Sequence, residues 1–159
     1  MGQVTTEAII AMPRAEAWAK MRDLSLSPYY VPGVTGVAFT TPQRDGVGAS
    51  RKILSKGRPP MDETVTAWEE GRGFTLKLHN GDKAPAPFKA AQFRYALEDA
   101  PGGQTLFRGT LSYEMPWGAL GQLLDTLIFN RLMAPVTAAI GPALKKFYET
   151  GKSANPLVA

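Results

Sequence analysis

The chain has 159 residues, of which 44% are hydrophobic and 20% are charged, and its formal net charge is +4. This composition excludes a disordered chain and indicates one ordinary soluble domain, residues 1–159. Because the chain has no cysteine and a single histidine, disulfides and thiolate sites are excluded and a zinc or iron centre is not expected. We therefore expect no metal and no other cofactor.

The N-terminal stretch and the basic residues bear on where the protein acts. Residues 1–10, MGQVTTEAII, carry no basic segment and no apolar run as long as a signal peptide or a membrane span. We therefore expect a cytoplasmic protein. Lys145, Lys146 and Lys152 lie near the C-terminus, where cations complement the negative end of a helix; contact with an acidic membrane surface or an acidic partner is the alternative. No basic stripe alternates with aromatic residues, so a nucleic-acid partner is not expected, and no pattern sets an oligomeric state.

Alternating apolar and polar residues, bounded by turn-forming residues, predict a series of strands. The predicted strands are residues 3–11, 34–41, 49–56, 61–69, 74–79, 92–98 and 105–115. Between the first two strands, Pro13 opens a short helix with Trp18 on its apolar side, and a second short helix carries Tyr29 and Tyr30.

The last long segment, residues 117–150, repeats apolar residues at steps of three and four, which predicts a helix with one buried face. The repeating positions are Leu120, Leu124, Ile128, Leu132, Val136, Ile140, Leu144 and Tyr148. Unbroken from residue 118 to residue 150, the helix would be roughly 45 Å long. Pro135 and Pro142 each lack an N–H and crowd the carbonyl four residues back, so we expect a bend between Arg131 and Pro142. The segment is either a core helix with two faults or a helix gripped by a curved sheet and bent over a cavity.

The order of the predicted elements limits the fold. An antiparallel sheet of this many strands, with only one long helix to cover it, must curl around that helix and bury one face. The two short helices would then close one end. The predicted fold class is α+β: a seven-stranded curved antiparallel sheet wrapped around a long C-terminal helix, with two short helices after the first strand.

Motifs along nearly the whole chain resemble those of one superfamily. They are Ile10-Ala11-x-Pro13, Ala17-Trp18, Asp23, Tyr30-x-Pro32-x-Val34, Gly46-x-Gly48-x-x-Arg51 and Glu63-x-Val65, followed by the closing helix. In these motifs the chain resembles the START and birch-pollen-allergen-like (SRPBCC) superfamily, and within it the polyketide cyclase/dehydrase-type branch. The resemblance implies a helix-grip fold with a deep hydrophobic cavity between sheet and long helix. Such proteins include lipid and hormone carriers and aromatase/cyclases, and fold analogy alone does not select among these roles.

Two charged residues are predicted to face the interior. Arg51 falls among Ala49 and Ile53 on one strand, while Glu63 falls among Met61, Val65 and Ala67 on the next. A hairpin centred near Gly57 would place Arg51 opposite Glu63, with β-carbons about 5 Å apart. An inward Arg and Glu need each other, because an unpaired buried charge is costly. The pair is either structural or a polar anchor for a carboxylate, carbonyl or phenol of an otherwise apolar ligand.

The same alternation predicts which side chains line the interior. Inward positions on the last two strands are Phe93, Tyr95, Leu97, Phe107, Leu111, Tyr113 and Met115. The predicted ligand-binding residues are Tyr29, Tyr30, Arg51, Glu63, Val65, Leu76, Phe93, Tyr95, Leu111, Tyr113, Leu124 and Ile128, with Tyr29 and Tyr30 at the edge of the entrance. His79 shares the parity of Thr75 and Lys77, so it should face solvent, where it would be a poor general base.

Three functions agree with these patterns. The first is binding of a hydrophobic or aromatic small molecule, such as a lipid or polyketide-like compound. The second is a cyclase or dehydratase, in which Arg51 would polarise a carbonyl and Glu63 or a tyrosine would move protons. The third is a peripheral membrane or partner-docking module that uses the basic, apolar end of the last helix. The absence of an inward histidine and of a separated acid/base pair favours binding over catalysis.

Overall fold

The structure, a computed structural model, describes residues 1–116, 118, 120, 123 and 130–158. Its strands are β1 (Gly2–Ile10), β2 (Val34–Phe39), β3 (Ser50–Ser55), β4 (Arg58–Glu69), β5 (Gly73–His79), β6 (Ala90–Ala100) and β7 (Gln104–Glu114). Its helices are α1 (Arg14–Met21), the short 3₁₀ helix η1 (Leu24–Tyr29) and α3 (Asn130–Thr150). The predicted order of elements is confirmed, with strand ends shifted by a few residues.

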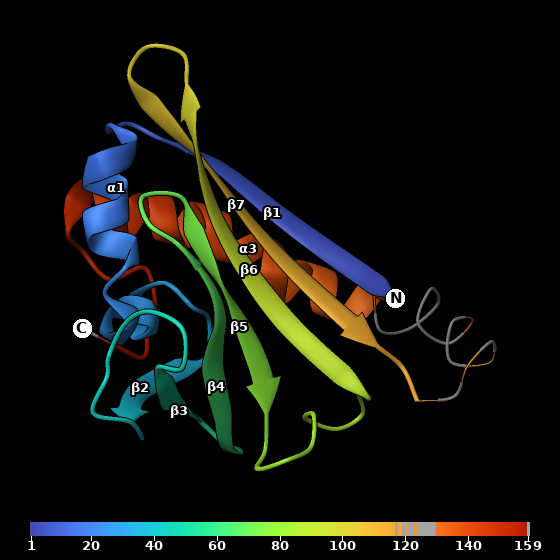
Figure 1. Cartoon of the computed structure of the whole chain (residues 1–159). Coiled ribbons are helices and arrows are strands. Elements are labelled where there is room, and N and C mark those ends of the chain that lie inside the picture. Colours follow the sequence, from blue (N-terminus) through green and yellow to red (C-terminus); the bar gives the residue numbers. More distant parts are fainter. Residues whose placement is uncertain (117, 119, 121–122, 124–129, 159) are drawn as a thin grey trace.

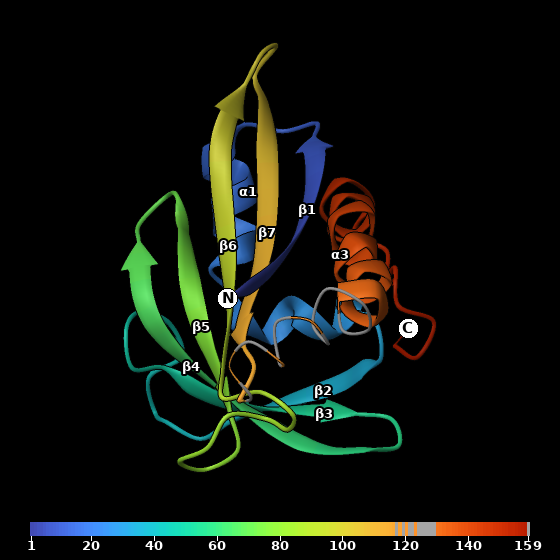
Figure 2. The ribbon, with the colours of Figure 1, turned by 90° about the vertical axis from the view of Figure 1, so that its right-hand side faces the viewer.

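The described strands form one antiparallel sheet in the order β1-β7-β6-β5-β4-β3-β2. Each neighbouring pair other than β1–β7 is joined by a direct connection along the chain, and α1 and η1 lie in the connection from β1 to β2. The sheet curls strongly, so that β2 and β3 turn away from the direction of β6, β7 and β1 (Figure 2). Helix α3 lies beside β1 on the inside of the curl (Figures 1 and 2). The predicted α+β helix-grip fold is confirmed.

A row of apolar side chains crosses the concave face of the sheet. Strand register places Val65 opposite Leu76, Leu76 opposite Phe93, Phe93 opposite Leu111, and Leu111 opposite Val4. All five side chains are buried. Because alternate residues of a strand point to the same face, this row confirms the predicted parity of β5, β6 and β7.

A bulge in β4 corrects one part of the predicted parity. The register shifts by one residue between Val65 and Ala67, so that Ala67 lies opposite Thr75 and Trp68 lies opposite Phe74. A one-residue shift exchanges the two faces of a strand. The prediction that Ala67 shares a face with Val65 is therefore wrong, and Trp68 is the inward residue, stacked on Phe74 with ring centroids 5.5 Å apart.

Helix α3 is attached to β1 at one of its internal prolines. Pro142 has no N–H to give to the carbonyl of Ala138, and the hydroxyl of Thr6 donates to that carbonyl at 3.1 Å. The N–H of Gly141 donates in turn to the same hydroxyl at 3.2 Å. A Cβ at Gly141 would lie 2.6 Å from Thr6 Oγ1 and 2.9 Å from the Glu7 carbonyl, so only glycine permits this close approach. The carbonyl that Pro142 leaves without a helical donor thus forms a hydrogen bond that joins the helix to the sheet.

The structure describes only part of the predicted C-terminal helix. Residues 130–150 are helical through both prolines, as predicted. Most of residues 117–129, including the predicted ligand-binding Leu124 and Ile128, lie outside the described residues. The bend between Arg131 and Pro142 stays a prediction. None of the helices in the described part of the chain is long and apolar enough to cross a membrane.

A C-terminal tail after α3 fixes the connection between η1 and β2. The side-chain amide of Asn155 donates to the carbonyls of Pro28 at 2.8 Å and Val34 at 2.7 Å, and approaches that of Val31 at 3.3 Å. The N–H of Ala154 donates to the Tyr29 carbonyl. Asn155 is itself buried. The tail therefore satisfies backbone carbonyls that the 3₁₀ turn leaves without helical partners.

We expect Thr6→Val to destabilise the fold by about 1–3 kcal/mol, because it leaves the Ala138 carbonyl and the Gly141 N–H without their partner at almost unchanged volume. Thr5→Val is the control, since Thr5 is exposed on the opposite face of the same strand. Urea denaturation followed by tryptophan fluorescence measures both. Equal midpoints for the two variants would show that this junction does not hold α3.

Candidate functional site

The predicted pair of inward charges is present. Arg51 on β3 lies directly opposite Glu63 on β4, and its Nε and one terminal nitrogen donate to the same carboxylate oxygen, Oε2, at 2.9 and 2.6 Å. Arg51 is 3% and Glu63 9% exposed. The neighbouring register positions, Phe39 and Leu78, are partly buried and pack against the core. An ion pair therefore sits in an otherwise apolar part of the concave face.

A third contact ties this pair to η1. The other terminal nitrogen of Arg51 donates to the main-chain carbonyl of Leu24, the first residue of η1. Burial alone would lower the pKa of Arg51, but the carboxylate of Glu63 holds it above its ordinary value. The guanidinium therefore stays charged, and its donors on both sides are engaged.

Two buried tyrosines lie beside the ion pair, and a third buried tyrosine lies beside those two. They are Tyr30 after η1, Tyr95 on β6 and Tyr148 on α3, each at most 4% exposed. Burial raises the pKa of Tyr30 to about 12, and it raises the pKa of Tyr95 and that of Tyr148 well above the ordinary value. The three hydroxyls interact with one another, and those of Tyr30 and Tyr95 also interact with Arg51 and Glu63. At neutral pH all three are protonated hydrogen-bond donors. Arg51, Glu63, Tyr30, Tyr95 and Tyr148 are called the polar cluster below.

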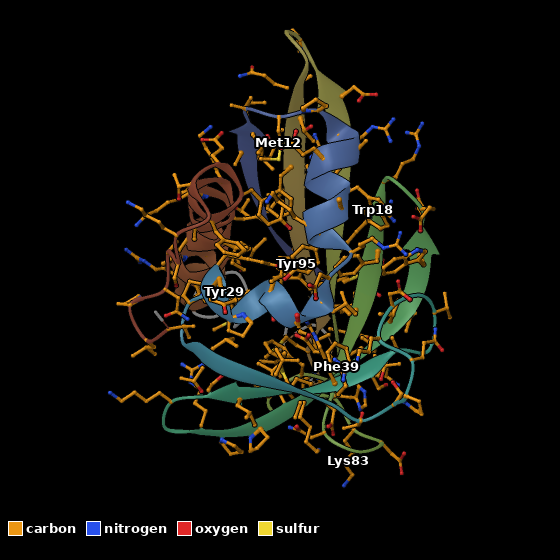
Figure 3. All side chains as sticks on the ribbon, turned by 90° about the vertical axis from the view of Figure 1, so that its left-hand side faces the viewer. Met12, Trp18, Tyr29, Phe39, Lys83 and Tyr95 are labelled. Atoms are coloured by element: carbon orange, nitrogen blue, oxygen red, sulfur yellow. The ribbon has the colours of Figure 1, made fainter. Side chains whose placement is uncertain are left out.

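Aromatic rings connect the polar cluster to both ends of the concave face. Tyr29 stacks on Phe147 with centroids 5.0 Å apart, and Tyr30 meets Tyr148 edge-on at 6.0 Å. On the other side Phe74 stacks on Tyr95 at 4.9 Å. Figure 3 shows Tyr95 near the centre of the molecule and Tyr29 toward α3. Such contacts add about 0.5–1.5 kcal/mol each and hold the rings in fixed orientations.

The predicted ligand-binding residues divide into three groups. Tyr30, Arg51, Glu63 and Tyr95 meet in the polar cluster, with half-buried Tyr29 beside it. The apolar row across the sheet holds Val65, Leu76, Phe93 and Leu111. Tyr113 is buried near the far end of β7, where it packs on Phe88. Their role in binding stays a prediction, as does that of Leu124 and Ile128.

His79 lies away from the polar cluster. It is opposite Asp62, one position along from the Glu63–Leu78 pairing, and therefore on the convex face. It is half-buried rather than exposed: Nε2 lies 2.8 Å from Thr64 Oγ1 and Nδ1 lies 2.8 Å from the Gly81 carbonyl. Because both ring nitrogens have protein partners, His79 remains unsuited to general-base chemistry at the cluster.

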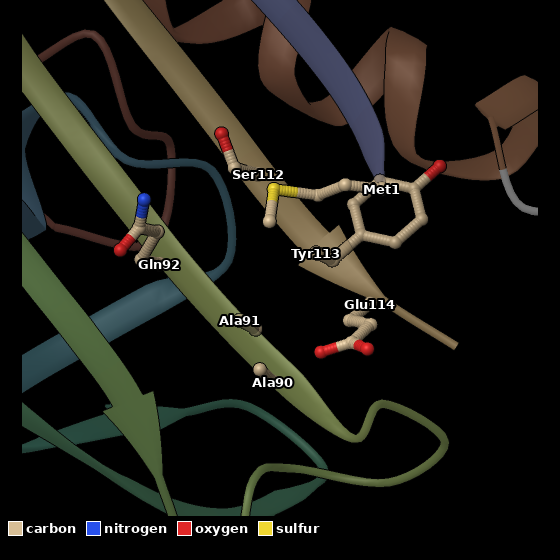
Figure 4. Close-up of a pocket in the computed structure, with 7 residues that line it drawn as sticks. All are labelled: Met1, Ala90, Ala91, Gln92, Ser112, Tyr113 and Glu114. Carbon is tan, nitrogen blue, oxygen red and sulfur yellow. The ribbon is translucent and has the colours of Figure 1, made fainter. Parts of the chain in front are cut away.

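Two surface pockets have walls made of described residues. One, of about 100 Å³, is bounded by Met1, Ala90, Ala91, Gln92, Ser112, Tyr113 and Glu114 where β6 and β7 meet the start of β1 (Figure 4). The other, of about 450 Å³, lies along the loop between β5 and β6 and is bounded by Asp82, Lys83, Ala84, Ala86, Pro87, Phe88 and Lys89. Neither pocket is lined by residues of the polar cluster, so the polar cluster and these two surface pockets are separate features.

Two contributors to the site were missed by sequence reasoning. The spacing of the last helix places Tyr148 on its buried face, as the structure confirms, but does not indicate that its hydroxyl joins a polar cluster. The Leu24 carbonyl has no sequence signal, because any residue carries one. Trp18, assigned to the core, is 5% exposed, and its indole donates to Glu70.

Truncating one member of the ion pair should be costly. We expect Arg51→Met and Glu63→Leu, made singly, each to destabilise the fold by about 3–5 kcal/mol, since each leaves a buried charge without its partner. The double variant should recover much of that loss because its neighbours are apolar. Lys52→Met is the control: Lys52 pairs with Asp62 at the next register position on the convex face and is half exposed, so the loss should stay within about 1 kcal/mol. Denaturant titrations give all four values, and neutral single variants would mean that the pair is solvated.

Solved structures share this architecture. The protein XoxI from Bacillus cereus superposes with a TM-score of 0.73 at 15% identity, covering 93% of this chain and 96% of XoxI. Ara h 8.0201 gives a TM-score of 0.63 at 14% identity, covering 92% and 97%. DynU16, a protein of the dynemicin biosynthetic locus, gives 0.64 at 17% identity, covering 99% of this chain but 51% of DynU16. At these identities the likeness concerns the fold alone.

Sequence comparison gives one local and one extended match. A 43-residue segment, 27% of this chain, is 49% identical to an L-type lectin-domain containing receptor kinase S.7 of Oryza sativa subsp. japonica, of which it spans only 6%. The family model described as "Polyketide cyclase / dehydrase and lipid transport" matches residues 1–149. With the helix-grip fold and the motifs already described, the chain belongs to this polyketide cyclase/dehydrase and lipid transport family of the SRPBCC superfamily.

Proposed function

We propose that the protein binds a hydrophobic or aromatic small molecule, of lipid or polyketide-like character, between the concave face of the sheet and the C-terminal helix. The observation that carries this proposal is the polar cluster: a satisfied ion pair and three protonated tyrosines in a face that is otherwise apolar and aromatic. Binding sites for small molecules combine an apolar wall with a few fixed polar groups in this way. Membership of the family supports the same reading.

The apolar row supplies the binding energy in this proposal. Val65, Leu76, Phe93 and Leu111 lie side by side across four strands, so that a flat or extended ligand would contact all of them. Burying apolar surface contributes roughly 25 cal/mol per Å². The polar cluster then determines the orientation of the ligand and contributes little to the binding free energy, because Arg51 and Glu63 already pair with each other.

A cyclase or dehydratase is the second candidate, and one observation favours it. Arg51 and the protonated tyrosines could polarise a carbonyl of a bound poly-carbonyl chain, and the family description includes such enzymes. Proton removal, however, needs a base. Glu63 is the carboxylate within the cluster, and one of its oxygens accepts two donors from Arg51. Binding is therefore the stronger proposal.

Docking on a membrane or a partner through the basic end of the last helix is less well supported. Lys145 donates to the Ile9 carbonyl and to Glu149, so it serves to attach α3 to β1. Lys146 and Lys152 are exposed, which is the usual state of lysines at a helix end.

Protein purified from its own host should carry a bound compound that native mass spectrometry detects as an added mass. Purified apo protein should also take up an apolar naphthalene probe, and Leu111→Trp should reduce that uptake at least several-fold by filling the concave face. Thr110→Trp is the control, since residue 110 is the chain neighbour on the convex face opposite Thr5. Circular dichroism establishes that both variants are folded before binding is compared.

The alternatives give different results in the same experiment. Probe uptake that Thr110→Trp and Leu111→Trp reduce equally would move the binding region off the concave face. A cyclase would convert a poly-carbonyl analogue, and the folded Arg51→Met/Glu63→Leu variant would still bind that analogue but leave the reaction at its uncatalysed rate. No added mass and no probe uptake would contradict the proposal.

A further inference from the structure

Two buried side-chain oxygens in the described part of the chain have no hydrogen-bond partner: Ser27 Oγ on η1 and Tyr148 Oη on α3. Both residues are almost completely buried, at 2% and 3% exposure. Buried polar groups are paired in the great majority of cases, and one left unpaired is destabilising. A buried hydroxyl without a partner beside a proposed binding face therefore calls for a specific explanation.

The position of Tyr148 makes it the more informative of the two. Its ring packs edge-on against Tyr30 at 6.0 Å and against Phe147 at 6.1 Å, which leaves the ring little freedom. Its hydroxyl belongs to the polar cluster through its interactions with Tyr30 and Tyr95. No geometrically satisfactory hydrogen bond from that hydroxyl exists among the described residues. The ring is thus held in place, while its hydroxyl interacts with those of Tyr30 and Tyr95 but lacks a hydrogen bond of acceptable geometry.

The charges of the polar cluster restrict what Tyr148 can bind. Arg51 and Glu63 neutralise each other, and the three tyrosines are uncharged, so the cluster as a whole has no net charge. A ligand carboxylate placed here would be desolvated without a free cation to pair with and would meet the fixed charge of Glu63. A hydroxyl donor of a ligand would add to a site already rich in donors. A neutral oxygen acceptor fits all of these conditions.

We propose that the hydroxyl of Tyr148 donates a hydrogen bond to a neutral carbonyl oxygen, of a ketone, quinone or ester, on the bound hydrophobic ligand. Tyr148 is then a specificity-determining residue that selects carbonyl compounds over hydrocarbons and carboxylates of the same shape. This inference rests on the proposed binding function and narrows its ligand class. It assigns the hydrogen bond to a residue on the helix, whereas the ion pair lies on the sheet.

Three probes of matched shape test the inference: 2-acetylnaphthalene as the ketone, 2-isopropylnaphthalene as the hydrocarbon and 2-naphthoate as the carboxylate. Isothermal titration calorimetry gives the Kd of each. We expect the unmodified protein to bind the ketone about threefold to tenfold more tightly than the hydrocarbon, the range of one net hydrogen bond, and to bind 2-naphthoate most weakly. Tyr148→Phe should bring the ketone and the hydrocarbon to equal affinity while leaving the Kd of the hydrocarbon unchanged.

Thr105→Val is the matched control for removing a buried hydroxyl. Thr105 is fully buried, and its Oγ1 donates to the Met12 carbonyl at 2.7 Å, so this variant loses a protein hydrogen bond. It should lower the denaturation midpoint but keep the preference for the ketone. Tyr148→Phe should do the opposite, with an unchanged or higher midpoint and no preference.

The outcomes separate this inference from the proposed function. Failure of the hydrocarbon to bind the unmodified protein would overturn both. Hydrocarbon binding without a ketone preference, or a preference that survives in Tyr148→Phe, would overturn the inference alone. A midpoint for Tyr148→Phe that falls as far as that of Thr105→Val would also overturn it, because the hydroxyl would then have a partner within the protein.

Discussion

The buried pair of Arg51 and Glu63 is the constraint on which the arrangement of the site depends. Removing two charges from water costs several kcal/mol for each ion, and their attraction repays that cost only if the remaining donors are satisfied. Glu63 accepts two of the donors of Arg51, and the Leu24 carbonyl accepts another. The pair therefore needs η1 against the sheet. For a helix of six residues with a proline inside, this contact adds to the hydrogen bonds from the C-terminal tail that hold it in position.

The elements that hold η1 in place connect the two edges of the sheet. Arg51 attaches η1 to β3 beside the edge strand β2, and Asn155 attaches the connection from η1 to β2 to the tail after α3. At the opposite edge, Thr6 attaches α3 to β1. Each contact satisfies a backbone group that its own element leaves open. The curl of the sheet is thus closed by a chain of polar contacts running from one edge, through η1, the tail and α3, to the other edge.

Much of this fold follows from local patterns in the sequence. Alternation places Phe93, Leu111 and their neighbours on the concave face, because a strand has a period of two residues. The pairing of Arg51 with Glu63 follows from the same rule together with the turn at Gly57. These inferences need only the residues of one strand or one hairpin, and they hold wherever the strand is regular.

Other features depend on what lies opposite and could not be predicted. The bulge in β4 exchanges the faces of Ala67 and Trp68, and no residue of the strand itself indicates that a bulge is present. The sequence around Asn155 does not indicate its hydrogen bonds to the carbonyls of Pro28 and Val34, because these carbonyls approach it only in the folded chain. Whether the hydroxyl of Tyr148 is paired depends on every element packed around it. Sequence gives a residue's face, while the partners on that face come from the tertiary structure.

The anchoring of α3 also determines where the hydroxyl of Tyr148 is directed. Three residues of α3 at steps of four contact β1 or Ala11, the residue just after it. The N–H of Gly141 donates to Thr6, the amine of Lys145 donates to the Ile9 carbonyl, and Glu149 accepts from the Ala11 N–H. The adjacent ridge, formed by Ile140, Leu144 and Tyr148, is buried. Because residues four apart lie one above the other on a helix, three attachments along one ridge fix the rotation of α3 about its axis. The contacts that secure the helix to the sheet edge are therefore also the contacts that orient the buried hydroxyl of Tyr148.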